Sequence, residues 1–86
     1  MYQKASVILY TRPGCHLCEK AKEQMLAARC ADLYELEEIN IEIDPALVER
    51  YGAKIPVITI NGVEAFRYHV HAAAIRESIR MSQHGV

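Results

Sequence analysis

Apolar and polar positions along this chain first form a pattern that predicts a strand followed by an amphipathic helix. Residues 6–10 are β-branched and apolar, which is typical of a buried strand. Residues 15–29 are rich in good helix formers, and their apolar side chains fall on one stripe at helical spacing. We therefore expect a helix from Cys15 to about Arg29 that packs on a sheet. The stripe includes Leu17, Cys18, Ala21, Met25 and Ala28.

The next strand is predicted within residues 34–43, where the apolar positions change phase. Apolar side chains occupy even-numbered positions up to Leu36 and odd-numbered positions from Ile39, with Glu37-Glu38 at the change. A slip of one residue turns every following side chain to the other face of a sheet. We therefore expect either a bulge or a late start to this strand.

A short helix is predicted to begin at Asp44-Pro45. Asp is a preferred N-cap residue, and Pro is favoured at the first helical position. We expect this helix to run through Tyr51, with Gly52 ending it.

The rest of the chain predicts a hairpin and a last helix. Residues 57–60 and 63–68 are strand-like runs joined by Asn61-Gly62, a strong signal for a tight hairpin turn. A helix is expected over about residues 70–82, with isoleucines on its apolar side and no strong N-cap residue at its start.

These elements together predict an α/β fold. A strand, a helix and a second strand in succession form a right-handed parallel unit, and the hairpin adds an antiparallel pair. We expect a mixed four-stranded sheet in the order β-α-β-α-β-β-α, with helices on both of its faces. The 86 residues allow one domain, so residues 1–86 are taken as a single unit.

Composition narrows the classes of function. The formal net charge is -1 with both signs interspersed, and neither a basic patch nor a charge block stands out. We therefore expect no nucleic-acid partner and no anionic membrane partner. Because no apolar run is long enough to cross a bilayer and no leader pattern is visible, we expect a cytoplasmic protein. Three cysteines, an odd number, do not form a secreted disulfide framework.

Cys15 and Cys18 form a CxxC motif where the first strand turns into the first helix. Unpaired backbone N–H groups and the helix dipole favour a thiolate at a helix N-terminus, lowering the thiol pKa from about 8.5 toward about 7. His16, when protonated, and Arg12 are candidates for further positive charge beside the thiol. Cys18 lies nearly one turn on, where it is able to attack a mixed disulfide at Cys15.

With this motif after the first strand and Ile55-Pro56 before the hairpin, the chain resembles the thioredoxin-fold superfamily. Within it, the chain is most similar to the small bacterial glutaredoxin-like proteins. The resemblance spans about residues 7–81 and rests on residues 9–18, 54–57 and the hairpin turn.

The resemblance implies three substrate-binding residues besides the two catalytic cysteines. Pro56 is expected to be cis beside the cysteines, and the backbone of Ile55 to pair with an extended thiol substrate. Arg12 stands where glutaredoxins commonly carry a lysine that contacts a glutathione carboxylate, a contact that arginine also makes.

The chain departs from the glutathione-using members in two places. Those members usually have a Gly-Gly pair before the last helix, whereas residues 66–70 here are bulky and lack glycine. The two residues between the cysteines, which are usually Pro-Tyr in those members, are His16-Leu17 in this chain. These changes imply that half of the expected glutathione pocket is missing or remodelled, around an intact dithiol.

The resulting hypothesis is a thiol–disulfide oxidoreductase of the glutaredoxin type, active in cell redox homeostasis and electron transport. Its substrate is a disulfide in a protein or small molecule, and its electron source is glutathione or thioredoxin reductase. We expect a monomer without a bound cofactor and without a metal ligand set.

Two alternatives remain open on the same fold. One is metal or iron–sulfur binding by the cysteine pair, within one chain or bridging two chains. The other is a redox-silent interaction module. Cys30 is expected to be a packing residue, because about 15 residues of helix would place it roughly 22 Å from Cys15. His69 and His71 are expected to be surface or packing residues.

Overall fold

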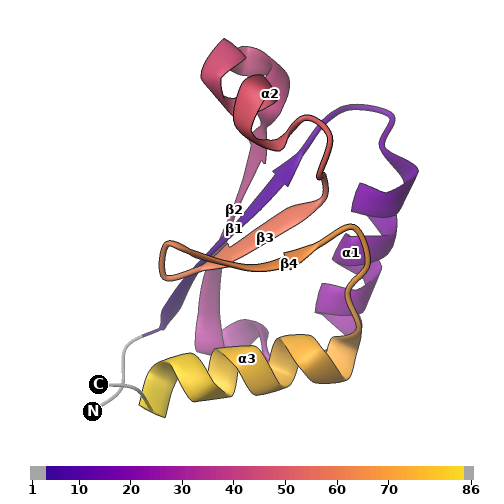
Figure 1. The fold of residues 1–86 in the computed structure, drawn as a ribbon. Coiled ribbons are helices and arrows are strands. Elements are labelled where there is room, and N and C mark those ends of the chain that lie inside the picture. The colour runs from indigo at the N-terminus through magenta and orange to yellow at the C-terminus, as the bar shows by residue number, and fades with distance from the viewer. Residues whose placement is uncertain (1–3, 85–86) are drawn as a thin grey trace.

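The computed structural model describes residues 4–84 and forms one four-stranded sheet with three helices (Figure 1). The strand order is β2-β1-β3-β4; β1 and β2 are parallel, and the other two neighbouring pairs are antiparallel. Element order and sheet type agree with the sequence prediction. The strands are β1 (Ala5–Thr11), β2 (Tyr34–Asn40), β3 (Val57–Ile60) and β4 (Val63–Arg67). The helices are α1 (His16–Ala27), α2 (Pro45–Tyr51) and α3 (Ala72–His84).

The core divides between the two faces of the sheet. Helices α1 and α3 contribute to the larger cluster, and α3 runs across the direction of α1 below the sheet (Figure 1). The smaller cluster joins α2 to the opposite face at one end of the sheet. The larger cluster includes Val7, Leu9, Met25, Ile58, Ile75 and Ile79; the smaller one consists of Ile41, Tyr51 and Val57, with Tyr10, Leu47 and Ile55 packed against it.

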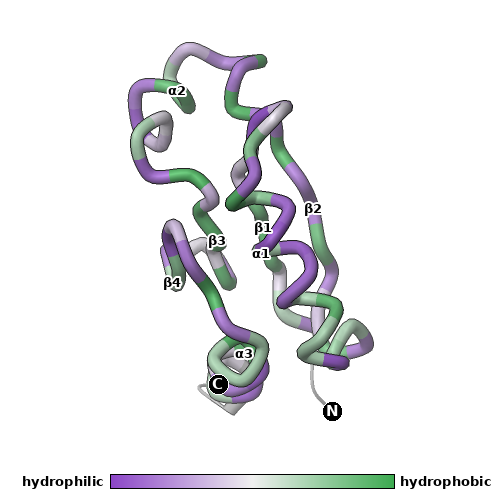
Figure 2. Tube along the Cα trace, turned by 90° about the vertical axis from the view of Figure 1, so that its right-hand side faces the viewer, coloured by the Kyte–Doolittle hydropathy of each residue, from purple (hydrophilic) through white to green (hydrophobic). Residues whose placement is uncertain are grey.

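Strand β2 corrects one prediction. It begins at Tyr34 and pairs with β1 in continuous register to Asn40, so it has neither a bulge nor a late start. The change of phase in the apolar positions reflects the place of β2 at the edge of the sheet. Leu36 remains 43% exposed there. Figure 2 shows apolar and polar residues interspersed along β2. Ile41 is buried only after the strand has ended in a short 3₁₀ turn.

The predicted turns and caps are present. The Asp44 Oδ1 accepts a hydrogen bond of 2.9 Å from the Ala46 N–H at the start of α2. Asn61 and Gly62 have φ values of 51° and 83°, the positive pair that a two-residue hairpin turn requires. The register of this hairpin shifts once, because Ile58 pairs with Phe66 and Thr59 pairs with Glu64, which leaves Ala65 of β4 as the extra residue.

Two helix ends differ from the prediction. Helix α1 ends at Ala27, because Arg29 turns into the left-handed region with a φ of 53°. Helix α3 starts at Ala72 rather than residue 70. Its missing local cap is supplied by α1, since the Gln24 Oε1 accepts a hydrogen bond of 2.9 Å from the Ala72 N–H. Between residues 4 and 84, no helix has the length and apolar character needed to cross a bilayer.

Candidate active site

Cys15 and Cys18 lie together at the N-terminus of α1. Cys15 is the N-cap residue, and its Sγ accepts a hydrogen bond of 3.1 Å from the Cys18 N–H. The two sulfur atoms form a disulfide, and their Cα atoms are 5.2 Å apart. This separation is within the range of about 4.4–6.8 Å that disulfides usually span. The backbone therefore holds the two sulfurs close enough for bonding and directs an N–H group at the first of them.

The two cysteines differ in exposure. Cys18 is 1% exposed and faces the core side of α1, whereas Cys15 is only partly buried. A thiol must be accessible to attack an external disulfide, and a resolving thiol needs access only to its neighbour. Exposure thus favours Cys15 as the attacking sulfur and Cys18 as the resolving one.

The loop before α1 makes a tight turn to place Cys15 at the helix start. Gly14 has a φ of 77°, a conformation that residues with a Cβ rarely adopt. The Cys15 N–H donates a hydrogen bond of 3.3 Å to the Arg12 carbonyl, which closes the turn. His16 is exposed at the first position of α1.

The Ile55-Pro56 bond is cis, as the resemblance implied. Val57 pairs with Tyr10 near the end of β1, so Pro56 lies at the same end of the sheet as the loop to Cys15. The Pro56 carbonyl accepts a hydrogen bond of 2.9 Å from the Tyr68 N–H. Among residues 4–84, the Ile55 N–H and carbonyl have no hydrogen-bond partner, which leaves them free to pair with an extended chain.

The structure places Arg12 against α2. The Arg12 Nη2 donates a hydrogen bond of 2.8 Å to the Gly52 carbonyl at the C-terminal end of α2, and its Nε is buried without a partner. A cation is stabilised there because the helix dipole is negative at that end. Arg12 therefore ties the loop before Cys15 to α2, a contact that sequence reasoning did not anticipate.

A pair of tyrosines supports the same end of the sheet. The Tyr10 and Tyr51 rings stack with centroids 4.3 Å apart, and the Arg50 guanidinium lies 5.3 Å from the centre of the Tyr51 ring. Burial, followed by the charge of Tyr51, raises the pKa of Tyr10 above its usual value. The sequence carries no signal for this pair, because the two residues are far apart in the chain.

The segment between β4 and α3 contains a strained turn. Tyr68 has a φ of 65°, and the His69 N–H donates a hydrogen bond of 2.8 Å to the Arg67 carbonyl across it. This i to i+2 bond with a positive φ at the centre is a rare, strained γ-turn. A left-handed conformation at a residue other than glycine costs about 1–3 kcal/mol and is often found at functional sites. The glycine-free sequence here indicated a remodelled segment but not this geometry.

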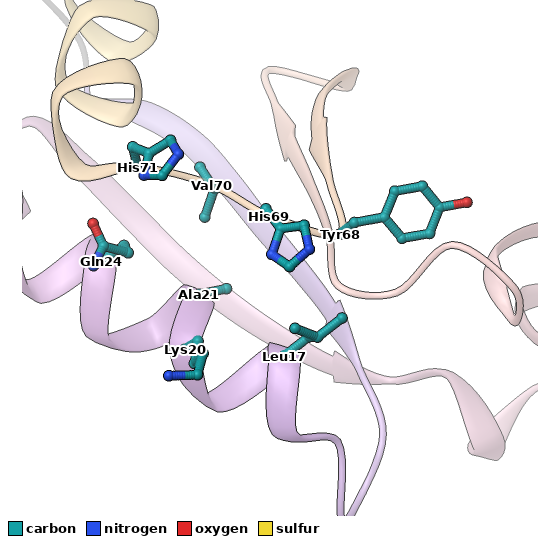
Figure 3. A pocket seen from close by; sticks show the side chains of 8 residues that line it. All are labelled: Leu17, Lys20, Ala21, Gln24, Tyr68, His69, Val70 and His71. Carbon is teal, nitrogen blue, oxygen red and sulfur yellow. The ribbon is translucent and has the colours of Figure 1, made fainter.

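A pocket of about 160 Å³ lies between α1 and this segment (Figure 3). The Tyr68 ring points away from α1, whereas the His69 ring lies toward Leu17. Leu17, which stands between the two cysteines in the chain, is the lining residue nearest to them in sequence. Its lining residues are Leu17, Lys20, Ala21 and Gln24 of α1 and Tyr68, His69, Val70 and His71 of the segment before α3.

Cys30 is separate from the dithiol. It is a free cysteine, 3% exposed within the larger core cluster, and burial raises the pKa of its thiol. Its position matches the prediction of a packing residue. Between residues 4 and 84, no three His, Cys, Asp or Glu side chains are grouped so that they could hold a metal ion.

The sequence of this chain is similar to those of known proteins. Residues 6–80 match the family model described as "Glutaredoxin-like domain (DUF836)". Uncharacterized protein Rv0508 of Mycobacterium tuberculosis is 25% identical over 87 residues, covering 95% of this chain and 90% of its own.

Two solved structures have similar folds. The target protein XcR50 from X. campestris has 28% sequence identity and a TM-score of 0.76, covering 87% of this chain and 96% of its own. Thioredoxin from Fasciola hepatica has 17% identity and a TM-score of 0.57, covering 91% of this chain and 80% of its own. The latter similarity concerns the fold, which is that of thioredoxin.

Proposed function

Because the chain belongs to the glutaredoxin-like domain family, we propose that it is a thiol–disulfide oxidoreductase that works through Cys15 and Cys18. The observation that carries this proposal is the cysteine pair at the start of α1. One sulfur accepts a backbone N–H and belongs to a partly buried residue, and the other is buried within bonding distance of it.

The reaction has two exchange steps. In the first, the Cys15 thiolate attacks one sulfur of a substrate disulfide, forming a bond between the Cys15 Sγ and that sulfur. The other substrate sulfur leaves as a thiolate and takes up a proton from water. In the second, Cys18 loses its proton and attacks the Cys15 Sγ, which releases the second substrate thiolate. The substrate gains two electrons and becomes two thiols, while the protein loses two electrons and becomes the disulfide form.

The backbone supplies the activation of Cys15. The Cys18 N–H directed at the Cys15 Sγ and the positive end of the α1 dipole both stabilise a thiolate more than a thiol. Substrate residues on either side of the attacked sulfur would pair with the free backbone groups of Ile55, beside the cis Pro56. We propose Arg12 as a further contact for a substrate carboxylate through the Nη N–H groups not bonded to Gly52, since its Nε is buried.

Cysteine variants test the proposal. Cys15→Ser is expected to abolish reduction of a disulfide substrate, and Cys18→Ser to accumulate a mixed disulfide at Cys15 that mass spectrometry detects. Cys30→Ser serves as the control, because that sulfur is buried away from the pair and should leave the rate unchanged. If exchange persists in Cys15→Ser, the proposed role of that sulfur is wrong.

Alkylation as a function of pH tests the activation step. In the Cys18→Ser variant, Cys15 should react with iodoacetamide at a lower pH than a free cysteine, whose pKa is about 8.5. Cys30 should react more slowly than Cys15, because burial both shields the thiol and raises its pKa. A titration of Cys15 that matches free cysteine would contradict the activation by the helix terminus.

We propose glutathione or thioredoxin reductase as the electron source and a reducing compartment such as the cytoplasm as the location. A dithiol that must be re-reduced after each turnover depends on such a source. Incubating the oxidised protein with reduced glutathione, or with NADPH and thioredoxin reductase, distinguishes the two. Appearance of free Cys15 and Cys18 thiols under one condition only identifies the reductant.

A further inference from the structure

We propose that the pocket between α1 and residues 68–71 binds a carboxylate next to the attacked disulfide, supplied by an acidic side chain of a protein substrate. This inference rests on the proposed exchange reaction and adds a class of substrate to it. Two lining residues connect the pocket to the proposed site: Leu17 directly precedes Cys18 in the chain, and the Tyr68 N–H donates a hydrogen bond of 2.9 Å to the Pro56 carbonyl.

The charge of the pocket favours an anion. None of its lining residues is acidic, and Lys20, His69 and His71 stand on its two walls. Within residues 4–84, none of these three side chains has a carboxylate partner. Lys22 on the same helix is different, since its Nζ lies 3.0 Å from Glu38 of β2.

The donors in the pocket also suit a carboxylate. The flexible stem of Lys20 allows its ammonium group to reach over the pocket, and an imidazole offers an N–H in either protonation state. His69 is brought there by the strained turn at Tyr68, which directs the tyrosine ring outward and the imidazole toward Leu17 (Figure 3).

The size of the pocket limits what enters it. A volume of about 160 Å³ is close to that of a protein cavity of about 150 Å³ that binds one benzene molecule. It therefore accommodates the end of a side chain rather than a whole peptide. Leu17 and Ala21 on the α1 wall provide apolar contact for the methylene groups of a glutamate, and the polar groups at the opening contact its carboxylate.

The test measures how fast the reduced full-length protein reacts with a set of short peptides. Each peptide carries one cysteine in a mixed disulfide with thionitrobenzoate, which becomes coloured on release. Glutamate, glutamine or lysine occupies one position at a time, before or after the cysteine. We expect glutamate at one position to react about 2- to 5-fold faster than glutamine, the effect of an exposed ion pair. Lysine there should react more slowly than glutamine.

Three variants assign this preference to the pocket. Lys20→Gln should bring the ratio of the glutamate rate to the glutamine rate close to one. Gln24→Glu should also reduce the ratio, because it adds a negative charge to the lining while keeping the acceptor for the Ala72 N–H. Lys22→Gln, with the same loss of charge on the same helix, should leave the ratio unchanged.

Each remaining outcome has a defined meaning. Equal rates for glutamate and glutamine in the unmodified protein would overturn the inference while leaving the exchange reaction in place. No colour with any peptide would instead contradict the proposed function. If Lys20→Gln slows reduction of glutathione disulfide but not of the glutamate peptide, the carboxylate belongs to a small molecule and the protein source is wrong.

Discussion

Gly52 shows how one residue without a side chain holds two parts of the site together. Its carbonyl accepts the hydrogen bond from Arg12, and its N–H donates a hydrogen bond of 2.8 Å to the Val48 carbonyl. A Cβ at this position would lie 2.5 Å from the Val48 oxygen and 3.5 Å from the Arg12 Nη2. The close approach of backbone, rather than an unusual φ, therefore favours glycine here.

We predict that Gly52→Ala destabilises the protein. Where no clash occurs, replacing glycine by alanine at an ordinary φ stabilises a protein by about 0.4–1 kcal/mol. Here the steric conflict with the backbone of α2 should reverse the sign and lower the free energy of unfolding by about 1–3 kcal/mol. Urea denaturation of both proteins in the oxidised state measures the difference. An increase in stability would mean that α2 adjusts without cost.

At the scale of elements, α3 depends on a cap from another helix. The segment before it has no Ser, Thr, Asp or Asn, and the Gln24 Oε1 of α1 takes the place of such a residue at the Ala72 N–H. A second contact between these regions is a hydrogen bond of 2.9 Å from the Arg76 Nε to the Ala28 carbonyl. The position of α3, and with it one wall of the pocket, therefore depends on α1.

We expect Gln24→Ala to lower the free energy of unfolding by about 0.5–2 kcal/mol, the usual cost of removing a helix cap. Gln24→Glu retains an oxygen acceptor and adds a negative charge at the positive end of α3, so its stability should be close to that of the unmodified protein. Comparing the thermal unfolding of the two Gln24 variants separates the role of the hydrogen-bond acceptor from that of side-chain volume. Equal destabilisation by both substitutions would exclude the cap as the cause.

At the scale of the whole molecule, buried groups link stability to pH. Desolvation raises the pKa of Cys30 above 9.0 and the pKa values of Tyr10 and Tyr34 above 10.0. Between the unfolded and the folded pKa, the folded state binds more protons than the unfolded state. Stability from these groups is complete below the unfolded pKa values and decreases as pH rises through the folded ones.

We therefore predict a decrease in the unfolding midpoint as pH rises above about 9. Urea titrations at several alkaline pH values measure it. Cys30→Ala and Tyr34→Phe should each make the decrease less steep, although both are expected to lower stability at neutral pH by altering the core. A midpoint that does not change in the alkaline range would contradict the predicted linkage.

Local signals in the sequence determined most of the fold and the position of the dithiol. The Asp44-Pro45 cap, the Asn61-Gly62 turn and the CxxC spacing each act within a few residues, so the chain around them suffices to interpret them. The edge strand was predicted less well, because the exposure of Leu36 depends on the position of β2 at one edge of the sheet that residues 4–84 form. The exposed fraction of a side chain at the edge of a sheet is a property of the assembled sheet.

Only the tertiary structure decided how the surroundings of the dithiol are built. The bond from Arg12 to Gly52 spans 40 positions, and the cap from Gln24 to Ala72 spans 48. The turn at Tyr68 is held by the Pro56 carbonyl. Contacts between distant residues depend on how the helices pack on the sheet, and a conformation strained by itself persists when such packing stabilises it. The sequence therefore located the reactive sulfurs, and the packing of distant segments shaped the pocket beside them.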